Sequence, residues 1–335
     1  MANMNIRTPR FYTDHINYFL NRGVSITNFK LLTSGSNLIT AYQNGSDSEL
    51  FDMRPTNPCT WDTSANTSDH ILINIDRVSS AYPSTNFIAI LNHNMATADA
   101  KVRVRYHATE SNVQDADMGS ATRIGTVTEV VNADSISNEI ITPATDGTTI
   151  FTFNNVTSRH FGIQFEGDST FNGTTDLSVG CIMIGEYLDM PHAPDLSVKR
   201  TIKYDSLKSN RSLGGQKYSN MVNFGRSTGL PTSGSTTTNY KLYGGRMAYD
   251  LSFSYLSATD IMPDSYSSIS NSDDNIIEDL WNMTHGSHTP FIFTADNTST
   301  SESDYLFARH KQDTLSMTQV APDVFNVSMK IEEEF

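Results

Sequence analysis

The stretch LSVGCIMIGEYLDMPHAPDL, residues 177–196, carries the strongest strand signal in the chain. Residues 179–187 form an apolar run with Gly180 and Gly185 near its ends, which is typical of a strand buried on both faces. Pro191 and Pro194 follow and favour an extended, non-helical exit. We therefore predict that this is the last strand of a first domain and that a domain boundary comes directly after it.

The sequence before this strand predicts an antiparallel β-sandwich or jelly roll over residues 51–190. Short apolar runs are separated by turn-rich clusters such as ATDGTT and GDSTFNGTTD, with no convincing helical period. These runs lie at residues 70–75, 87–91, 102–106, 126–131, 150–153 and 161–165. Residues 1–50 are interpreted as a lead-in or tether packed on this domain, with a short helical turn within residues 11–20.

The sequence after the boundary predicts a second β-sandwich or barrel with one short helix over residues 191–335. The helix is expected at residues 273–286, where apolar residues recur at helical spacing before Gly286. The Gly/Ser/Thr-rich loop 225–240 is too polar to pack and is predicted to be mobile. Strands are expected at residues 197–204, 244–257, 290–296, 305–310, 314–321 and 324–335. The predicted fold class is thus all-β and mostly antiparallel.

The composition excludes several classes of partner. A net charge of −14 and a pI near 4.9 argue against binding to nucleic acid or to an anionic membrane surface. No stretch approaches the roughly 18 apolar residues of a membrane span, and no secretory signal is expected. Cys59 and Cys181 could form a disulfide, but the presence of two cysteines does not establish one. The sequence has no CxxC spacing of the kind that binds zinc.

The residues that could suggest catalysis or metal binding are better explained as turns. His285 and His288 in HGSH could hold a metal only within a helix, and Gly286 favours a turn there. Asp189, His192 and Asp195 lack an accompanying GxSxG serine. We therefore predict a non-enzymatic protein without a metal or cofactor.

Two sets of residues remain as candidate binding sites. Asn92, His93 and Asn94 follow a predicted strand and could contact a sugar or a partner loop; the alternative, which we favour, is a polar turn whose side chains cap their own backbone. Residues 199–217 are the most basic part of the chain and could face an acidic partner, although a solvated loop is the alternative. The predicted assembly-interface residues are Arg200, Lys203, Tyr243, Arg246, Trp281 and Phe335, of which Trp281 could equally belong to a core.

The first half resembles discoidin or galactose-binding-like jelly rolls. The resemblance rests on Trp61 followed by ILINID (71–76), FIAILNHN (87–94), KVRVRY (101–106), RHFGIQFEG (159–167) and VGCIMIGEY (179–187). It implies a jelly roll whose loops, here around residues 92–94, contact a ligand.

The second half is similar to virion structural proteins of tailed bacteriophages, marine ones in particular. The segments on which this similarity rests are GEYLDMPHAPDLSVKR, GGRMAYDLSFSYL, TPFIFTAD, FARHKQDTLSMTQVA and VFNVSMKIEEEF. The resemblance implies a virion protein of the tail tip, baseplate or fibre attachment, which would assemble with itself and with other virion proteins. The alternatives are a carbohydrate-binding adhesin for host surface glycans and a capsid decoration or cement protein.

Overall fold

The computed structural model describes residues 6–78, 84–115, 118–137, 139–166, 171–203, 207–221, 246–263 and 274–334. Within them the protein is mostly antiparallel β-structure with a few short helices, which confirms the predicted fold class. None of the helices in these ranges is long and apolar enough to cross a membrane. The predicted mobile loop 225–240, Tyr243 and Phe335 lie outside the described residues.

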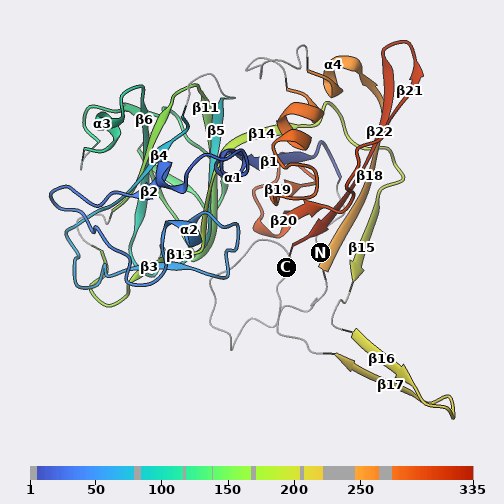
Figure 1. Cartoon of the computed structure of the whole chain (residues 1–335), viewed down its shortest axis with the longest axis horizontal. Helices are drawn as coiled ribbons and strands as arrows, with labels where there is room; N and C mark the ends of the chain where they lie inside the picture. Colours follow the sequence, from blue (N-terminus) through green and yellow to red (C-terminus); the bar gives the residue numbers. More distant parts are fainter. Residues whose placement is uncertain are drawn as a thin grey trace.

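One eleven-stranded sheet runs through both halves of the chain (Figure 1). Its order is β15-β18-β22-β20-β19-β1-β14-β5-β11-β8, and β21 (Met317–Ala321) pairs with β22 beside this path. In that order the bounds are Lys199–Lys203, Arg246–Ser257, Val324–Glu333, Tyr305–His310, Phe291–Thr294, Arg10–Asp14, Cys181–Asp189, Thr85–His93, Gly147–Val156 and Thr128–Val131.

A second, seven-stranded sheet packs on the first half of the large one. Its order is β2-β4-β12-β6-β10-β9, and β7 pairs with β6. The strands are Phe29–Leu31, Ile71–Asp76, His160–Glu166, Lys101–His107, Ile140–Thr142, Asp134–Ser137 and Thr122–Arg123. Two small ladders complete the strands, β3 (Cys59–Trp61) with β13 (Leu177–Val179) and β16 (Leu207–Arg211) with β17 (Lys217–Met221).

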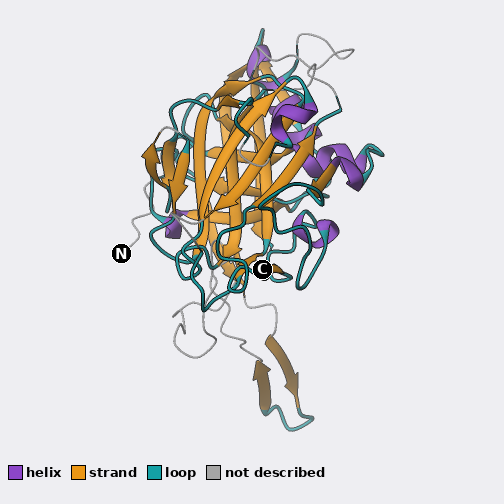
Figure 2. Cartoon of the chain, turned by 90° about the vertical axis from the view of Figure 1, so that its left-hand side faces the viewer, coloured by secondary structure: helices purple, strands orange, loops and turns teal. Residues whose placement is uncertain are grey.

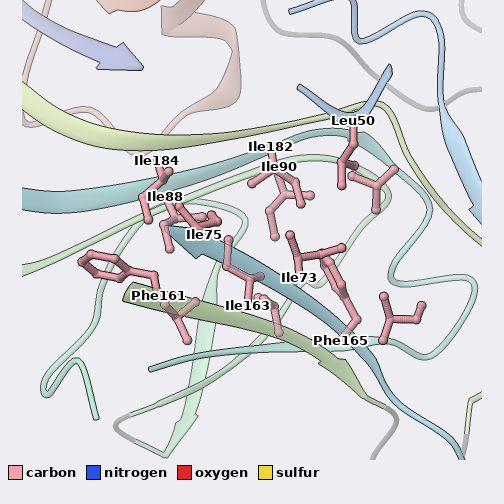
Figure 3. Close-up of a cluster of buried hydrophobic side chains, with 14 of the residues drawn as sticks. Leu50, Ile73, Ile75, Ile88, Ile90, Phe161, Ile163, Phe165, Ile182 and Ile184 are labelled. Atoms are coloured by element: carbon pink, nitrogen blue, oxygen red, sulfur yellow. The ribbon is translucent and has the colours of Figure 1, made fainter. Parts of the chain in front are cut away.

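The space between these two sheets is filled by the largest apolar cluster of the protein. Figure 3 shows Ile73 of β4 and Ile163 of β12 on one side, and Ile88 of β5 and Ile184 of β14 on the other. All four side chains are at most 1% exposed. Alternate residues of each strand face this core, as the apolar runs predicted. The first half is therefore a β-sandwich.

Strand β1 joins the two halves of the large sheet. Phe11 lies opposite Leu188 of β14 on one side and Phe293 of β19 on the other. Phe11 and Tyr12 are fully buried. The prediction that residues 1–50 form a tether is therefore corrected, because residues 10–14 are an interior strand of the sheet. The boundary after residue 190 stays a prediction, and the sheet is continuous across it.

The second half covers one face of the shared sheet with short helices. These are α4 (Ala258–Ile261) and the π-helix η2 (Ile276–Asn282), which falls within the predicted helix 273–286. Their apolar residues, such as Ile261 and Leu280, join a cluster with Phe253, Phe293 and Met329. The second half differs from the predicted separate sandwich or barrel, since its long strands extend the sheet of the first half.

The remaining helical turns lie on the connections. They are α1 (His15–Asn21), η1 (Ile26–Asn28), α2 (Asp47–Leu50), α3 (Glu110–Val113) and η3 (Glu302–Asp304). Helix α1 begins directly after β1, because the carboxylate of Asp14 accepts a hydrogen bond from the Asn17 backbone N–H and caps the helix. Cys59 and Cys181 are both buried and are not bonded to each other.

Candidate assembly surface

Strand β15 forms one end of the large sheet. Among the strands that the structure describes, it pairs with β18 alone, with Arg200 opposite Tyr249 and Lys203 opposite Arg246. Most of its side chains are exposed, including Ile202 at 44%. A terminal strand leaves a row of backbone N–H and C=O groups without a neighbour in the sheet, and proteins often place lysines on such strands. The predicted interface residues Arg200 and Lys203 therefore lie on a sheet edge.

The two predicted residues of β15 point to opposite faces of the sheet. The Arg200 guanidinium reaches the apolar face, where Nη2 lies 2.7 Å from the sulfur of Met247 and the group sits 5.6 Å from the Tyr249 ring centre. Its contact with an aromatic face is a cation–π interaction. Met247 and Tyr249 belong to the apolar cluster of Phe253 and Phe293, so Arg200 lies at the margin of that cluster. Its guanidinium charge stays close to the edge of the sheet.

Lys203 lies on the other face, where a charged cluster surrounds one carboxylate. The Glu332 carboxylate lies 2.7 Å from Lys311 Nζ, 3.7 Å from Arg246 Nη1 and 4.0 Å from Lys203 Nζ. We call these four residues the Glu332 cluster. Lys203 and Arg246 are direct cross-strand neighbours of like charge, which would repel without the carboxylate between them. Three cations of the described chain thus share the Glu332 carboxylate.

We predict that Glu332→Gln lowers the free energy of unfolding by about 1 kcal/mol in dilute buffer, because it removes the carboxylate with which three cations of the cluster form ion pairs. The loss should shrink in about 1 M salt, where the Debye length is roughly 3 Å. Urea unfolding at both salt concentrations measures this. Glu334→Gln is the matched control, since Glu334 forms an ion pair with Arg309 alone among the pairs of the described chain. A loss that is the same at both salt concentrations would contradict the electrostatic explanation.

Strands β16 and β17 form a hairpin that projects away from the two large sheets (Figures 1 and 2). The strands pair with each other in a register that sets Arg211 opposite Lys217, and Gly215 adopts a positive φ of 83° in the turn. Near the turn Leu213 is fully exposed, and Tyr218 is 57% exposed. The hairpin carries part of the basic stretch predicted from the sequence, but its strands were not predicted. Its polar residues show no clear alternation that could have indicated them.

Trp281 is half-buried in η2. Its ring lies 5.0 Å from the ring of His310, and it also faces Gly286. Trp281 is thus packed on one side but belongs to none of the buried apolar clusters, so both the interface and the core interpretations stay predictions. Arg246 belongs to the Glu332 cluster. The predicted interface residues that the structure describes therefore lie in two places, Arg200, Lys203 and Arg246 at the sheet edge and Trp281 in η2.

Asn92, His93 and Asn94 direct their polar atoms into the protein. The Asn92 amide donates to the Pro55 carbonyl, and the Asn94 amide donates to the Asp176 carbonyl. His93 is fully buried and bonds the Thr149 hydroxyl at 2.8 Å. Burial lowers the pKa of His93 to about 4, so the ring is neutral at pH 7. His93 also accepts a hydrogen bond from the Met95 backbone N–H, as in the polar-turn alternative, whereas Asn92 and Asn94 bond residues far along the chain.

The other sequence candidates are not brought together. Asp189 pairs with Arg10 at 2.7 Å, His192 bonds the Ala193 carbonyl, and Asp195 accepts from the Ser254 hydroxyl. His285 has a positive φ of 49° in a turn. Within the described ranges, the acidic, histidine and cysteine side chains form no group of three or more that could hold a metal ion.

Sequence reasoning missed a group of buried carboxyls where η2 meets β14. Glu186 of β14 and Asp279 of η2 are at most 8% exposed, and they interact electrostatically with each other and with Glu278 and Asp274. Burial, reinforced by these neighbours, raises the pKa of Glu186 to about 7 and that of Asp279 to about 8. The signal was present, because Glu186 interrupts an otherwise apolar strand.

Comparison with models of known protein families finds no match, and comparison with curated protein sequences finds none either.

Proposed function

We propose that this chain is a non-enzymatic structural component of a tailed-phage particle, which assembles in symmetric copies at the tail tip, the baseplate or the fibre attachment. The observation that carries the proposal is the basic end of the large sheet. Strand β15 and the Glu332 cluster gather five cationic side chains, Lys199, Arg200, Lys203, Arg246 and Lys311, near the carboxylates of Glu332 and Asp250, on a chain whose net charge is −14.

A charge distribution of this kind suits contacts between protein subunits. Charges of opposite sign on facing surfaces steer association and fix the register of the contact. The lysines of β15 disfavour strand addition from an arbitrary chain, so recognition at this edge would depend on acidic side chains of the partner. The resemblance of the second half to tailed-phage virion proteins supports a particle as the setting of this contact.

The architecture adds a second line of support. The large sheet passes without interruption through both halves, with β1 buried at its centre. The interstrand hydrogen bonds of this sheet tie the two halves together, which suits a protein held between neighbours in a particle. A glycan site at residues 92–94 is not carried forward, because those side chains already bond the interior.

Quantitative mass spectrometry of density-purified phage particles that encode this chain tests the proposal. We expect the chain in the particles at a copy number that fits a cyclic ring or a small multiple of one. Its absence from purified particles would refute a virion role. Copy numbers on the order of hundreds, matching the capsid protein, would instead support a head decoration protein and refute the tail position.

A further inference from the structure

We infer that the hairpin β16–β17, residues 207–221, is an arm that lies on the acidic surface of a second copy of this chain. The inference names the partner of the assembly surface proposed above, and it rests on that proposal for its setting in a particle. It follows from three properties of the hairpin, which are its isolation, its charge and its exposed apolar side chains.

The hairpin has no core of its own. Within the described residues its two strands pair with each other and with no further strand, and nearly all its described side chains are exposed. A two-stranded hairpin is marginally stable by itself in water, because one ladder does not offset the conformational entropy of two ordered strands. In an assembly, the free energy that keeps such a hairpin ordered therefore comes from its contacts with a partner surface.

The charge of the arm identifies the chemistry of that surface. Residues 207–221 contain Lys208, Arg211 and Lys217 and no acidic residue. Over residues 199–217 there are six Lys or Arg and one Asp, a net charge of +5, so the rest of the chain carries −14 − 5 = −19. A second copy of the same chain thus offers the acidic surface that a basic arm requires, and the sign of charge gives the contact its direction.

The exposed side chains of the arm are of the kinds that stabilise protein interfaces. Tyr and Arg are enriched among the residues that contribute most to binding, and here Tyr218 lies next to Lys217 and across the ladder from Asn210. Leu213 at the turn is fully exposed, so a partner that covered it would gain the free energy of burying its side chain. An arm that carries both can add apolar burial to its electrostatic attraction.

Sedimentation velocity of the full-length chain over a concentration series tests the inference. We expect self-association with a Kd below about 100 μM at low salt. The variant Lys208→Glu/Lys217→Glu should weaken this association at least about tenfold, and raising the salt concentration should weaken it in the wild type. Leu213→Ser should also weaken it, without any change of charge.

The matched control is Lys30→Glu/Arg54→Glu, which makes the same change of net charge in the first half of the chain. Arg54 is exposed there, and Lys30 is partly exposed. We expect it to associate within about threefold of the wild type. A wild-type chain that stays monomeric at about 100 μM, or an arm variant that associates as tightly as the wild type, would overturn the inference. Neither result would decide the proposed virion role. Mass spectrometry could still find the chain in purified particles, with the hairpin bound to a different protein.

Discussion

Gly185→Ala is expected to destabilise the protein by about 3 kcal/mol or more. Gly185 lies in β14 opposite Asp14 of β1 and Phe87 of β5. A Cβ atom at this position would lie 1.9 Å from the backbone oxygen of Thr13 and 3.2 Å from the backbone nitrogen of His15. Both are backbone atoms at the point where β1 turns into α1, so no side chain can move aside. Strand β1 would have to shift away from β14.

Urea unfolding of the variant measures this effect, and Gly173→Ala is the control. A Cβ at Gly173 would meet only the Thr67 methyl at 3.8 Å, an ordinary contact, so this change should alter the free energy of unfolding by less than about 0.5 kcal/mol. Similar stabilities for the two variants would mean that β1 does not lie against β14 as described.

The second large effect concerns the buried carboxyls between η2 and β14. Because the folded-state pKa of Asp279 is about 8 and that of Glu186 about 7, both above their ordinary values near 4, each stays protonated in the folded state while it ionises in the unfolded state. Their favourable contribution is complete below about pH 4 and is lost as the pH rises toward 8. The free energy of unfolding should therefore fall over this range.

Asp279→Asn is expected to remove much of this dependence. The asparagine keeps an oxygen that can accept the hydrogen bond of 2.7 Å from the Asn275 backbone N–H, but it cannot ionise. We expect the variant to be more stable than the wild type by about 2–5 kcal/mol at pH 8 and similar to it at pH 4.

Chemical denaturation at several pH values measures this difference. Asp323→Asn removes an exposed carboxylate from the turn before β22 and serves as the control. Equal stability curves for Asp279→Asn and wild type at pH 8 would contradict the described burial of Asp279.

The parts of the fold that could be predicted are those whose signal is local. The apolar runs at residues 70–75, 87–91 and 179–187 predicted β4, β5 and β14, because alternation or continuous apolarity depends only on neighbouring residues. Strand β1 was missed for the opposite reason. Its burial comes from pairing with strands some 175 and 280 positions away in the sequence, and five residues such as RFYTD carry too little pattern to indicate that.

The same distinction applies to the candidate site. The basic stretch could be recognised from residue types alone, but the Glu332 cluster depends on the register that brings Lys203, Arg246 and Glu332 onto one face. The apolar spacing of residues 276–283 indicates a helix without distinguishing an α-helix from the π-helix found. For Asn92–Asn94, the decisive fact is which hydrogen-bonding groups lie within reach, and these are the backbone carbonyls of Pro55 and Asp176 and the hydroxyl of Thr149.

The most direct test of the proposed function is electron microscopy of intact phage particles labelled with an antibody against this chain. We expect the label at the tail, concentrated at its tip, baseplate or fibre attachment, in a pattern that repeats around the tail axis. Label spread evenly over the head, or particles that remain unlabelled while the purified chain binds the antibody, would contradict the proposal.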